Sequence, residues 1–115
     1  MLQLKNNIQK EDCIKDCLDC YRSCLRTVMY SLGKGGEYAG REYISSLLDC
    51  VEICKANATL MTQGSSFYKN VCELCADFCR KCVRECSGFG DDVEIKNCIN
   101  ACLSCEKSCL EMARS

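Results

Sequence analysis

Cysteines recur at intervals of three and four residues along this 115-residue chain, which contains 15 of them. Residues three or four apart share one face of an α-helix, and alternating threes and fours average the 3.5-residue repeat of an inward-facing bundle seam. The spacing therefore predicts helices that each present a stripe of thiols to a common core. Three stripes are complete: Cys13, Cys17, Cys20 and Cys24; Cys72, Cys75, Cys79, Cys82 and Cys86; and Cys98, Cys102, Cys105 and Cys109.

Glycine-containing breaks divide the chain into four segments. The absence of proline favours uninterrupted helices, and glycine, serine and aspartate in the breaks supply helix ends and caps. We predict helices at about 11–32, 39–63, 66–87 and 92–113. Short breaks make neighbouring helices antiparallel, so the expected fold is all-α, an up-down-up-down four-helix bundle forming a single domain over residues 1–115. Within residues 1–10, Leu2, Leu4 and Ile8 allow a short additional helix that covers the bundle.

The second predicted helix keeps the spacing but carries thiols only at its middle. Its seam reads Tyr43, Leu47, Cys50, Cys54, Asn57 and Met61. Asn57 fits a polar residue that sets the register of the bundle. Apolar residues beside the thiol stripes should supply hydrophobic stabilisation of about 1.5–3 kcal/mol for each large side chain that is buried. They include Ile14, Leu18, Tyr21, Leu25, Val28, Leu32, Leu74 and Leu103.

The dense cysteines would ordinarily indicate a secreted disulfide scaffold. Their odd number, their helical spacing and an N-terminus without a signal-like apolar run oppose that interpretation. We therefore predict a cytoplasmic protein with reduced thiols. A net charge of −1 gives no reason to expect a nucleic-acid or membrane partner, and no segment is apolar enough to span a bilayer.

Several chemistries compete for such a core. Buried thiols can serve as small apolar residues, but valine or leucine would stabilise the core more. Disulfides between helices are geometrically feasible, yet they do not require cysteine at every seam position. The Cys72–Cys75 and Cys79–Cys82 pairs superficially match iron–sulfur spacings, without the loop and proline of the bacterial ferredoxin motif. Zinc can bind adventitiously, although its all-cysteine sites need four sulfurs around a tetrahedron.

Cu(I) fits the pattern best. It is a soft ion that selects thiolates, and it accepts two or three ligands. Two sulfurs at i and i+4, or from facing helices, can then form one site, and bridging thiolates can join successive sites along the bundle. A pair of one Cu(I) and one thiolate is neutral, which eases its burial. We therefore predict many Cu(I) ions per chain, bound by all fifteen cysteines, including Cys50 and Cys54.

These stripes resemble those of the cysteine-rich four-helix-bundle copper storage proteins of bacteria, over the whole chain. The resemblance implies cytosolic Cu(I) storage or buffering and a homotetramer of bundles, and a copper chaperone would be a suitable delivery partner. Family members often place histidine and methionine at the open end of the bundle, whereas this chain has no histidine. No nucleophile–base pair is recognisable, so we expect no enzymatic activity. The alternative is an iron–sulfur or other thiol redox protein.

Antiparallel topology separates the two ends of the bundle. One end should gather Cys13, Met61, Tyr68, Cys109 and Met112. We predict that it is the mouth, with Met61 and Met112 as weak, exchangeable Cu(I) ligands; the alternative is that both methionines only fill gaps. The other end should be sealed by Val28, Leu32, Tyr43, Leu47, Cys86 and Ile95.

Overall fold

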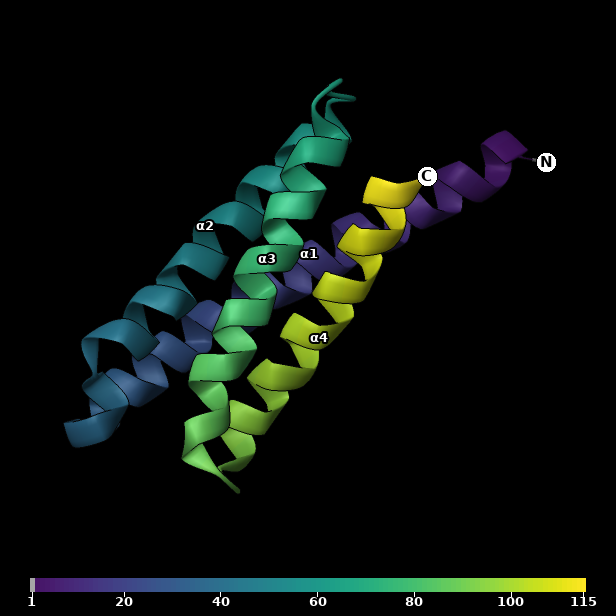
Figure 1. The fold of residues 1–115 in the computed structure, drawn as a ribbon. Helices are drawn as coiled ribbons and strands as arrows, with labels where there is room; N and C mark the ends of the chain where they lie inside the picture. Colours follow the sequence, from purple (N-terminus) through teal and green to yellow (C-terminus); the bar gives the residue numbers. More distant parts are fainter. Residues whose placement is uncertain (1) are drawn as a thin grey trace.

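The protein is an all-α four-helix bundle, as predicted (Figure 1). The computed structural model describes the backbone of residues 2–115 and the side chains from residue 4 onward. The helices are α1 (Leu2–Lys34), α2 (Arg41–Thr62), α3 (Tyr68–Cys86) and α4 (Val93–Arg114). Short 3-10 turns, η1 (Gly36–Ala39) and η2 (Ser87–Phe89), follow α1 and α3. The helices form a ring in which each packs against its two neighbours.

The N-terminal segment does not form the separate covering helix that residues 1–10 allow. From Leu2 it belongs to α1, whose 33 residues make it the longest helix of the molecule. At about 1.5 Å per residue such a helix spans about 50 Å, and its first turns project beyond the ends of the other helices (Figure 1). Leu4 and Ile8 are 60% and 53% exposed, because at this point α1 has little to pack against.

The helix ends follow the breaks, but α2 and α3 both begin two residues later than predicted. Helix α2 does so because residues 36–39 form the turn η1. Gly35 and Gly64 adopt φ angles of 73° and 72°, which glycine tolerates without strain. Asp92 caps α4 as predicted, since its carboxylate accepts a hydrogen bond of 3.2 Å from the Ile95 amide. Helix α3 begins at Tyr68, two residues later than predicted, because Ser65 accepts the Phe67 amide in a turn rather than capping the helix.

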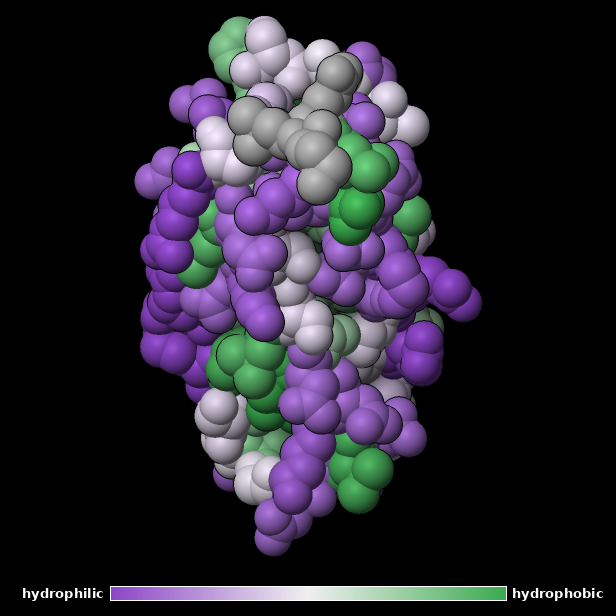
Figure 2. Space-filling view, turned by 90° about the vertical axis from the view of Figure 1, so that its right-hand side faces the viewer, coloured by the Kyte–Doolittle hydropathy of each residue, from purple (hydrophilic) through white to green (hydrophobic). Residues whose placement is uncertain are grey.

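The core is made mostly of sulfur. All fifteen cysteines are buried, whereas several leucines expected to stabilise the core are nearly half exposed: Leu18 at 43%, Leu25 at 39%, Leu74 at 45% and Leu103 at 46%. The thiols occupy the inward seam, so these leucines lie on its flanks and meet solvent. The face in Figure 2 is mainly hydrophilic, with apolar side chains in separate islands.

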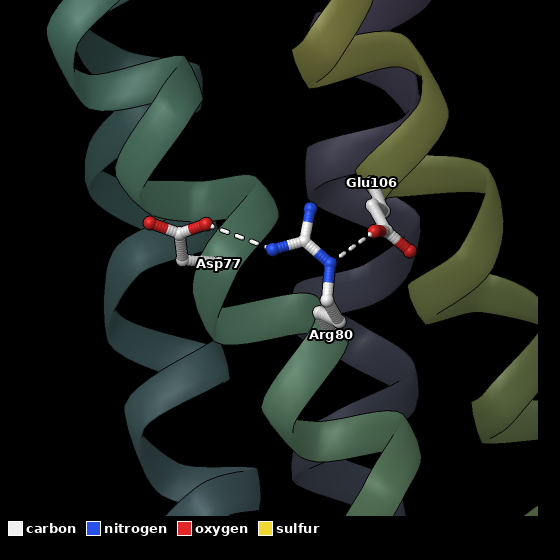
Figure 3. A network of polar contacts seen from close by, with 3 residues as sticks. All are labelled: Asp77, Arg80 and Glu106. Carbon is white, nitrogen blue, oxygen red and sulfur yellow. Dashed lines mark hydrogen bonds and ion pairs between the residues drawn. The ribbon is translucent and has the colours of Figure 1, made fainter.

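Surface ion pairs add contacts between neighbouring helices. Arg80 of α3 lies between Asp77 of its own helix, at 3.0 Å, and Glu106 of α4, at 2.9 Å (Figure 3). Because Arg80 and Asp77 are about half exposed, solvent screens this network, and its contribution to stability is small. It fixes the register of α3 against α4 more than it stabilises the bundle.

Candidate metal centre

Each thiol stripe faces thiols of a neighbouring helix. The Sγ atoms of Cys54 and Cys75 are 3.6 Å apart between α2 and α3, and those of Cys13 and Cys109 are 3.7 Å apart between α1 and α4. Within one helix, Cys105 and Cys109 are 3.9 Å apart. Sulfurs on facing helices and sulfurs one turn apart on the same helix are therefore about equally close, so either kind of pair can hold a two-coordinate ion.

Twelve of the fifteen thiols form overlapping groups rather than isolated sites; Cys82, Cys86 and Cys98, nearer the other end of the core, belong to none of these groups. In each group the Sγ atoms lie within 4.8 Å of one another, and several cysteines belong to two groups. A separate four-coordinate ion in every group would need the same sulfur twice, so neighbouring ions must share bridging thiolates. The groups are Cys13, Cys72 and Cys109; Cys17, Cys75, Cys105 and Cys109; Cys54, Cys75, Cys79 and Cys105; Cys20, Cys50, Cys54 and Cys79; and Cys20, Cys24, Cys50 and Cys102.

The charge of the core restricts which metal it can hold. Among the described side chains, the buried polar residues are Thr27, Ser31, Ser46 and Asn57, all neutral. A zinc ion with four thiolates carries two negative charges, which nothing in this core would compensate. One Cu(I) ion per thiolate is neutral, so the core can fill completely without accumulating charge.

Protons are held unevenly near the Met61 end of the thiol core. Contacts with Cys105, Cys109 and Cys13 lower the pKa of Cys17 to about 6, because its sulfur accepts from its neighbours. For Cys72, the contact with Cys109 lowers the pKa, but the contact with Cys13 and burial together have the larger, opposite effect. The pKa of Cys72 therefore rises to about 11. Metal loading at neutral pH must therefore displace a proton from Cys72.

Asn57 lies among the sulfurs instead of only setting the register. It is fully buried, and its Nδ2 atom is 3.6, 3.5 and 3.6 Å from the Sγ atoms of Cys17, Cys72 and Cys109. It stands where the seam of α2 would place another cysteine. Its NH2 group has two hydrogens and so can donate to two of these three sulfurs at a time, while its Oδ1 atom accepts from the Cys72 thiol at 3.7 Å. Asn57 therefore belongs to the thiol core.

The methionine end contains a cavity. Met61 and Met112 are buried, and the Sδ atom of Met61 is 3.8 Å from the Sγ atom of Cys72. Both methionines line a cavity of about 320 Å³, together with Tyr68 and the first turns of α1. Of the five residues predicted at this end, Met61, Tyr68 and Met112 line the cavity, whereas Cys13 and Cys109 are fully buried and do not. The lining by α1 was not predicted, because residues 1–10 were not expected to continue that helix.

An aromatic layer closes the other end. The Phe89 ring stacks on Tyr38, with 4.5 Å between centroids, and lies 4.4 Å from the Tyr43 ring. Beneath these rings, Leu47 and Ile95 are fully buried. Tyr43, Leu47 and Ile95 are buried at this end, where they were predicted, whereas Tyr38 and Phe89 were not predicted to lie here. The available signal was an aromatic residue inside each glycine-rich break.

Hydrogen bonds hold the aromatic layer in place. The hydroxyl groups of Tyr30 and Tyr38 both donate to Asp92, at 2.8 and 2.9 Å, and these bonds raise the pKa of both tyrosines. Burial raises the pKa of Tyr43, whose hydroxyl pairs with Ser31 at 2.8 Å. Leu32, predicted as part of the seal, is instead 50% exposed, because it lies on the outer side of α1.

A search of protein families identifies this architecture. The family model described as copper storage protein matches residues 6–114. The chain belongs to the copper storage protein family. The predicted family and four-helix fold are therefore confirmed. In the part of the chain that the structure describes, no helix has the length and apolar character to cross a bilayer.

Individual relatives in the copper storage protein family agree. The chain is 33% identical to the uncharacterized cysteine-rich protein YhjQ of Bacillus subtilis, over 90% of this chain and 94% of that one. It superimposes on the Cu(I)-bound copper storage protein BsCsp3 with a TM-score of 0.85, at 32% identity over 91% and 98% of the two chains. A cytosolic copper storage protein from Streptomyces lividans, solved with five coppers, shares the fold at 24% identity, with a TM-score of 0.84 and 96% of each chain covered.

Proposed function

We propose that this protein stores or buffers Cu(I) as thiolate-bound ions inside its bundle. The observation that carries the proposal is a core of overlapping thiol groups with no buried charge among the described residues. Membership of the copper storage family and the Cu(I) bound by BsCsp3 support the same ion. The role is one of binding and release, without catalysis.

The proposed ligands are the fifteen core thiolates, with Met61 and Met112 as transient ligands at the mouth. The thiolates hold the stored ions, while the thioethers are weaker and exchange faster. The cavity beside the two methionines, and the 3.8 Å contact between Met61 and Cys72, support this division. The stored ions would be held by Cys13, Cys17, Cys20, Cys24, Cys50, Cys54, Cys72, Cys75, Cys79, Cys82, Cys86, Cys98, Cys102, Cys105 and Cys109.

A reducing compartment suits this core, and we propose the cytoplasm. All fifteen cysteines are free thiols, many with a neighbouring sulfur less than 4 Å away. Oxidation to disulfides would remove the thiolates that Cu(I) needs. The Streptomyces lividans protein that shares this fold is also described as cytosolic.

We further propose that several copies assemble, with a tetramer as the expected size, and that a copper chaperone delivers the ions. Leu18, Leu25, Met29 and Leu32 leave an apolar stripe exposed along α1, and Leu48 is 43% exposed on α2. Light scattering of the reduced protein, coupled to size-exclusion chromatography, tests the assembly. A strictly monomeric species would contradict it.

Anaerobic titration with Cu(I) against a competing chelator tests the storage function. If each thiolate bridges two ions and each ion takes two thiolates, the plateau lies at roughly 15 ions per chain, without visible colour. A plateau at one to four ions, or visible charge-transfer bands with iron, would instead favour a discrete cluster or redox protein. Zinc should bind in smaller amounts and be displaced by Cu(I).

A further inference from the structure

The cavity at the methionine end, here called the mouth cavity, is larger than one metal ion requires. Its volume is about 320 Å³, within the range of pockets that bind small molecules, roughly 300–1,000 Å³. Asn6, Asn7 and Lys10 of α1 form one side of it, and Met61 and Met112 contribute from α2 and α4. The first turns of α1, which project beyond the other helices (Figure 1), therefore contribute one side of the mouth cavity.

The charge of the mouth cavity favours an anion. Among the described residues that line it, Lys10 is the charged one, and the others are amides, hydroxyls, glycine and methionines. A second cavity, of about 330 Å³, differs, since three acidic residues, Asp12, Asp16 and Glu111, outnumber Lys107 in its lining, and no core sulfur lines it. A free cation would be drawn to that acidic cavity and repelled by Lys10.

We propose that the mouth cavity binds a small anionic complex of Cu(I) with low-molecular-weight thiolates, attracted by Lys10. The proposal rests on the Cu(I) role proposed above and names the form in which the ion arrives. Two thiolates on one Cu(I) ion give a complex with net negative charge, even before any carboxylates of the thiol compound are counted. Such a complex can place its Cu(I) ion and its thiolate sulfurs in this cavity beside Lys10. This route would operate alongside the copper chaperone proposed above, which is too large to enter the cavity.

Transfer then proceeds by ligand exchange. The Cu–S bonds to the carrier break as Cu–S bonds to the protein form, first at Met61 and Met112 and then at Cys72. Each protein thiol that binds copper gives its proton to a released carrier thiolate, and copper stays Cu(I) throughout. The 3.8 Å separation between Met61 and Cys72 makes this path continuous with the group of Cys13, Cys72 and Cys109.

Stopped-flow loading under anaerobic conditions tests the proposal with two carriers of opposite charge. Cu(I)–glutathione is anionic, whereas Cu(I)–cysteamine carries two ammonium groups and is cationic. The Lys10→Glu substitution should slow loading from the glutathione complex roughly three- to tenfold and leave cysteamine loading unchanged or faster. Lys10→Gln should show a smaller effect, and ionic strength near 1 M, where the Debye length is about 3 Å, should remove the difference.

Lys96→Glu is the matched control. Lys96 is 54% exposed near the sealed end and pairs only with the exposed Asp91, so this variant has the same net charge as Lys10→Glu with the change placed far from the mouth. It should load at the parent rate from both carriers. Circular dichroism of each variant confirms that the bundle is intact.

Two results would overturn the inference. In the first, Lys10→Glu changes the loading rate equally for both carriers; in the second, neither Lys10→Glu nor Lys96→Glu changes the loading rate. The total Cu(I) capacity separates this failure from failure of the storage function. If the variants bind the full number of Cu(I) ions but Lys10→Glu does not distinguish the two carriers, only the small anionic complex is rejected, and delivery by a protein carrier still stands. A parent protein that binds only a few ions rejects the storage function itself.

Discussion

The two ends of the bundle are closed in different ways. At one end, Tyr38, Tyr43 and Phe89 form a packed aromatic layer over fully buried aliphatic side chains. At the other end, Met61 and Met112 lie at a cavity walled by the projecting turns of α1. Because the thiol core between them is continuous, we expect the direction of copper uptake to depend on how each end is closed and not on the core thiols.

Copper loading should change the two ends unequally, and this is the largest expected effect. Cu–S bonds cross-link helices at the mouth, where packing is incomplete, whereas the aromatic layer is already packed. Ligand at about 1,000 times its Kd stabilises a site by about 4 kcal/mol. Hydrogen-exchange mass spectrometry should therefore show the largest gain in protection around Met61 and Cys72, and the smallest around Tyr43.

The comparison fails if copper protects both ends equally, or the aromatic end more. The apo-protein should already be helical, because its apolar residues and caps do not depend on metal. An apo chain with the circular dichroism of a random coil would mean that metal builds both ends together, and the contrast would not exist before loading.

Truncating Leu47 tests whether the aromatic end is a seal. Leu47 is fully buried, so Leu47→Ala should lower the free energy of unfolding by about 2–5 kcal/mol, measured by urea denaturation of the apo-protein. The Cu(I) loading rate should stay unchanged, because the rings of Tyr43 and Phe89 still cover the site. Val51→Ala, a buried truncation in the middle of α2, controls for general loosening. Faster loading in Leu47→Ala than in Val51→Ala would place the mouth at this end.

Removing the mouth thioethers should affect rate more than stability. Replacing Met61 and Met112 together by leucine keeps their volume, so the free energy of unfolding should fall by less than about 1.5 kcal/mol. Loading and chelator-driven release should both slow, because the exchangeable ligands are gone, while the final capacity stays nearly constant. Stopped-flow kinetics and equilibrium titration measure the two quantities.

Met29→Leu is the control for the methionine pair. Met29 is 65% exposed on α1, away from the mouth cavity, so its replacement should leave all rates unchanged. If the double variant also keeps the parent rates, the two methionines are packing residues and copper passes the mouth without them.

The thiol core was predictable from sequence because its periodicity is strict. Spacing alone places Cys13 and Cys109, 96 residues apart, on facing seams, and the structure brings their sulfurs to 3.7 Å. The ends were less predictable, since no period extends through a glycine-rich break. Phe89 and Tyr38 lie in 3-10 turns, and their stacking depends on how two separate breaks meet in space.

The first turns of α1 were hidden for a different reason. Residues 4–8 are exposed, so they carry no core-facing pattern that would reveal a helix. Their helical state follows from continuity with the strongly patterned segment after them. The exposed leucines show that an apolar stripe can also overpredict burial. Leu18 and Leu74 fit such a stripe, but cysteine fills the seam positions, so both leucines lie outside the core.

The smallest expected effect concerns the polar support of the sealed end. Asp92→Ala removes the cap of α4 and the acceptor of Tyr30 and Tyr38, and should cost about 1 kcal/mol at neutral pH. Burial raises the pKa of Asp92, but the hydrogen bonds from Tyr30, Tyr38 and the Ile95 amide outweigh it, so the folded pKa is lowered. The contribution is then complete above the unfolded pKa of about 3.9 and is lost as the pH falls through the folded value.

The difference in unfolding free energy between the parent and Asp92→Ala should therefore shrink as the pH drops below about 4, when both are measured as reduced apo-proteins. Asp92→Asn should retain most of the cap, because asparagine is an equally good N-cap residue. Asp91→Ala is the control, since Asp91 is fully exposed and reaches only Lys96 at 3.3 Å. A difference that stays constant with pH would show that the charge on Asp92 does not support the aromatic end, which would then depend on ring packing alone.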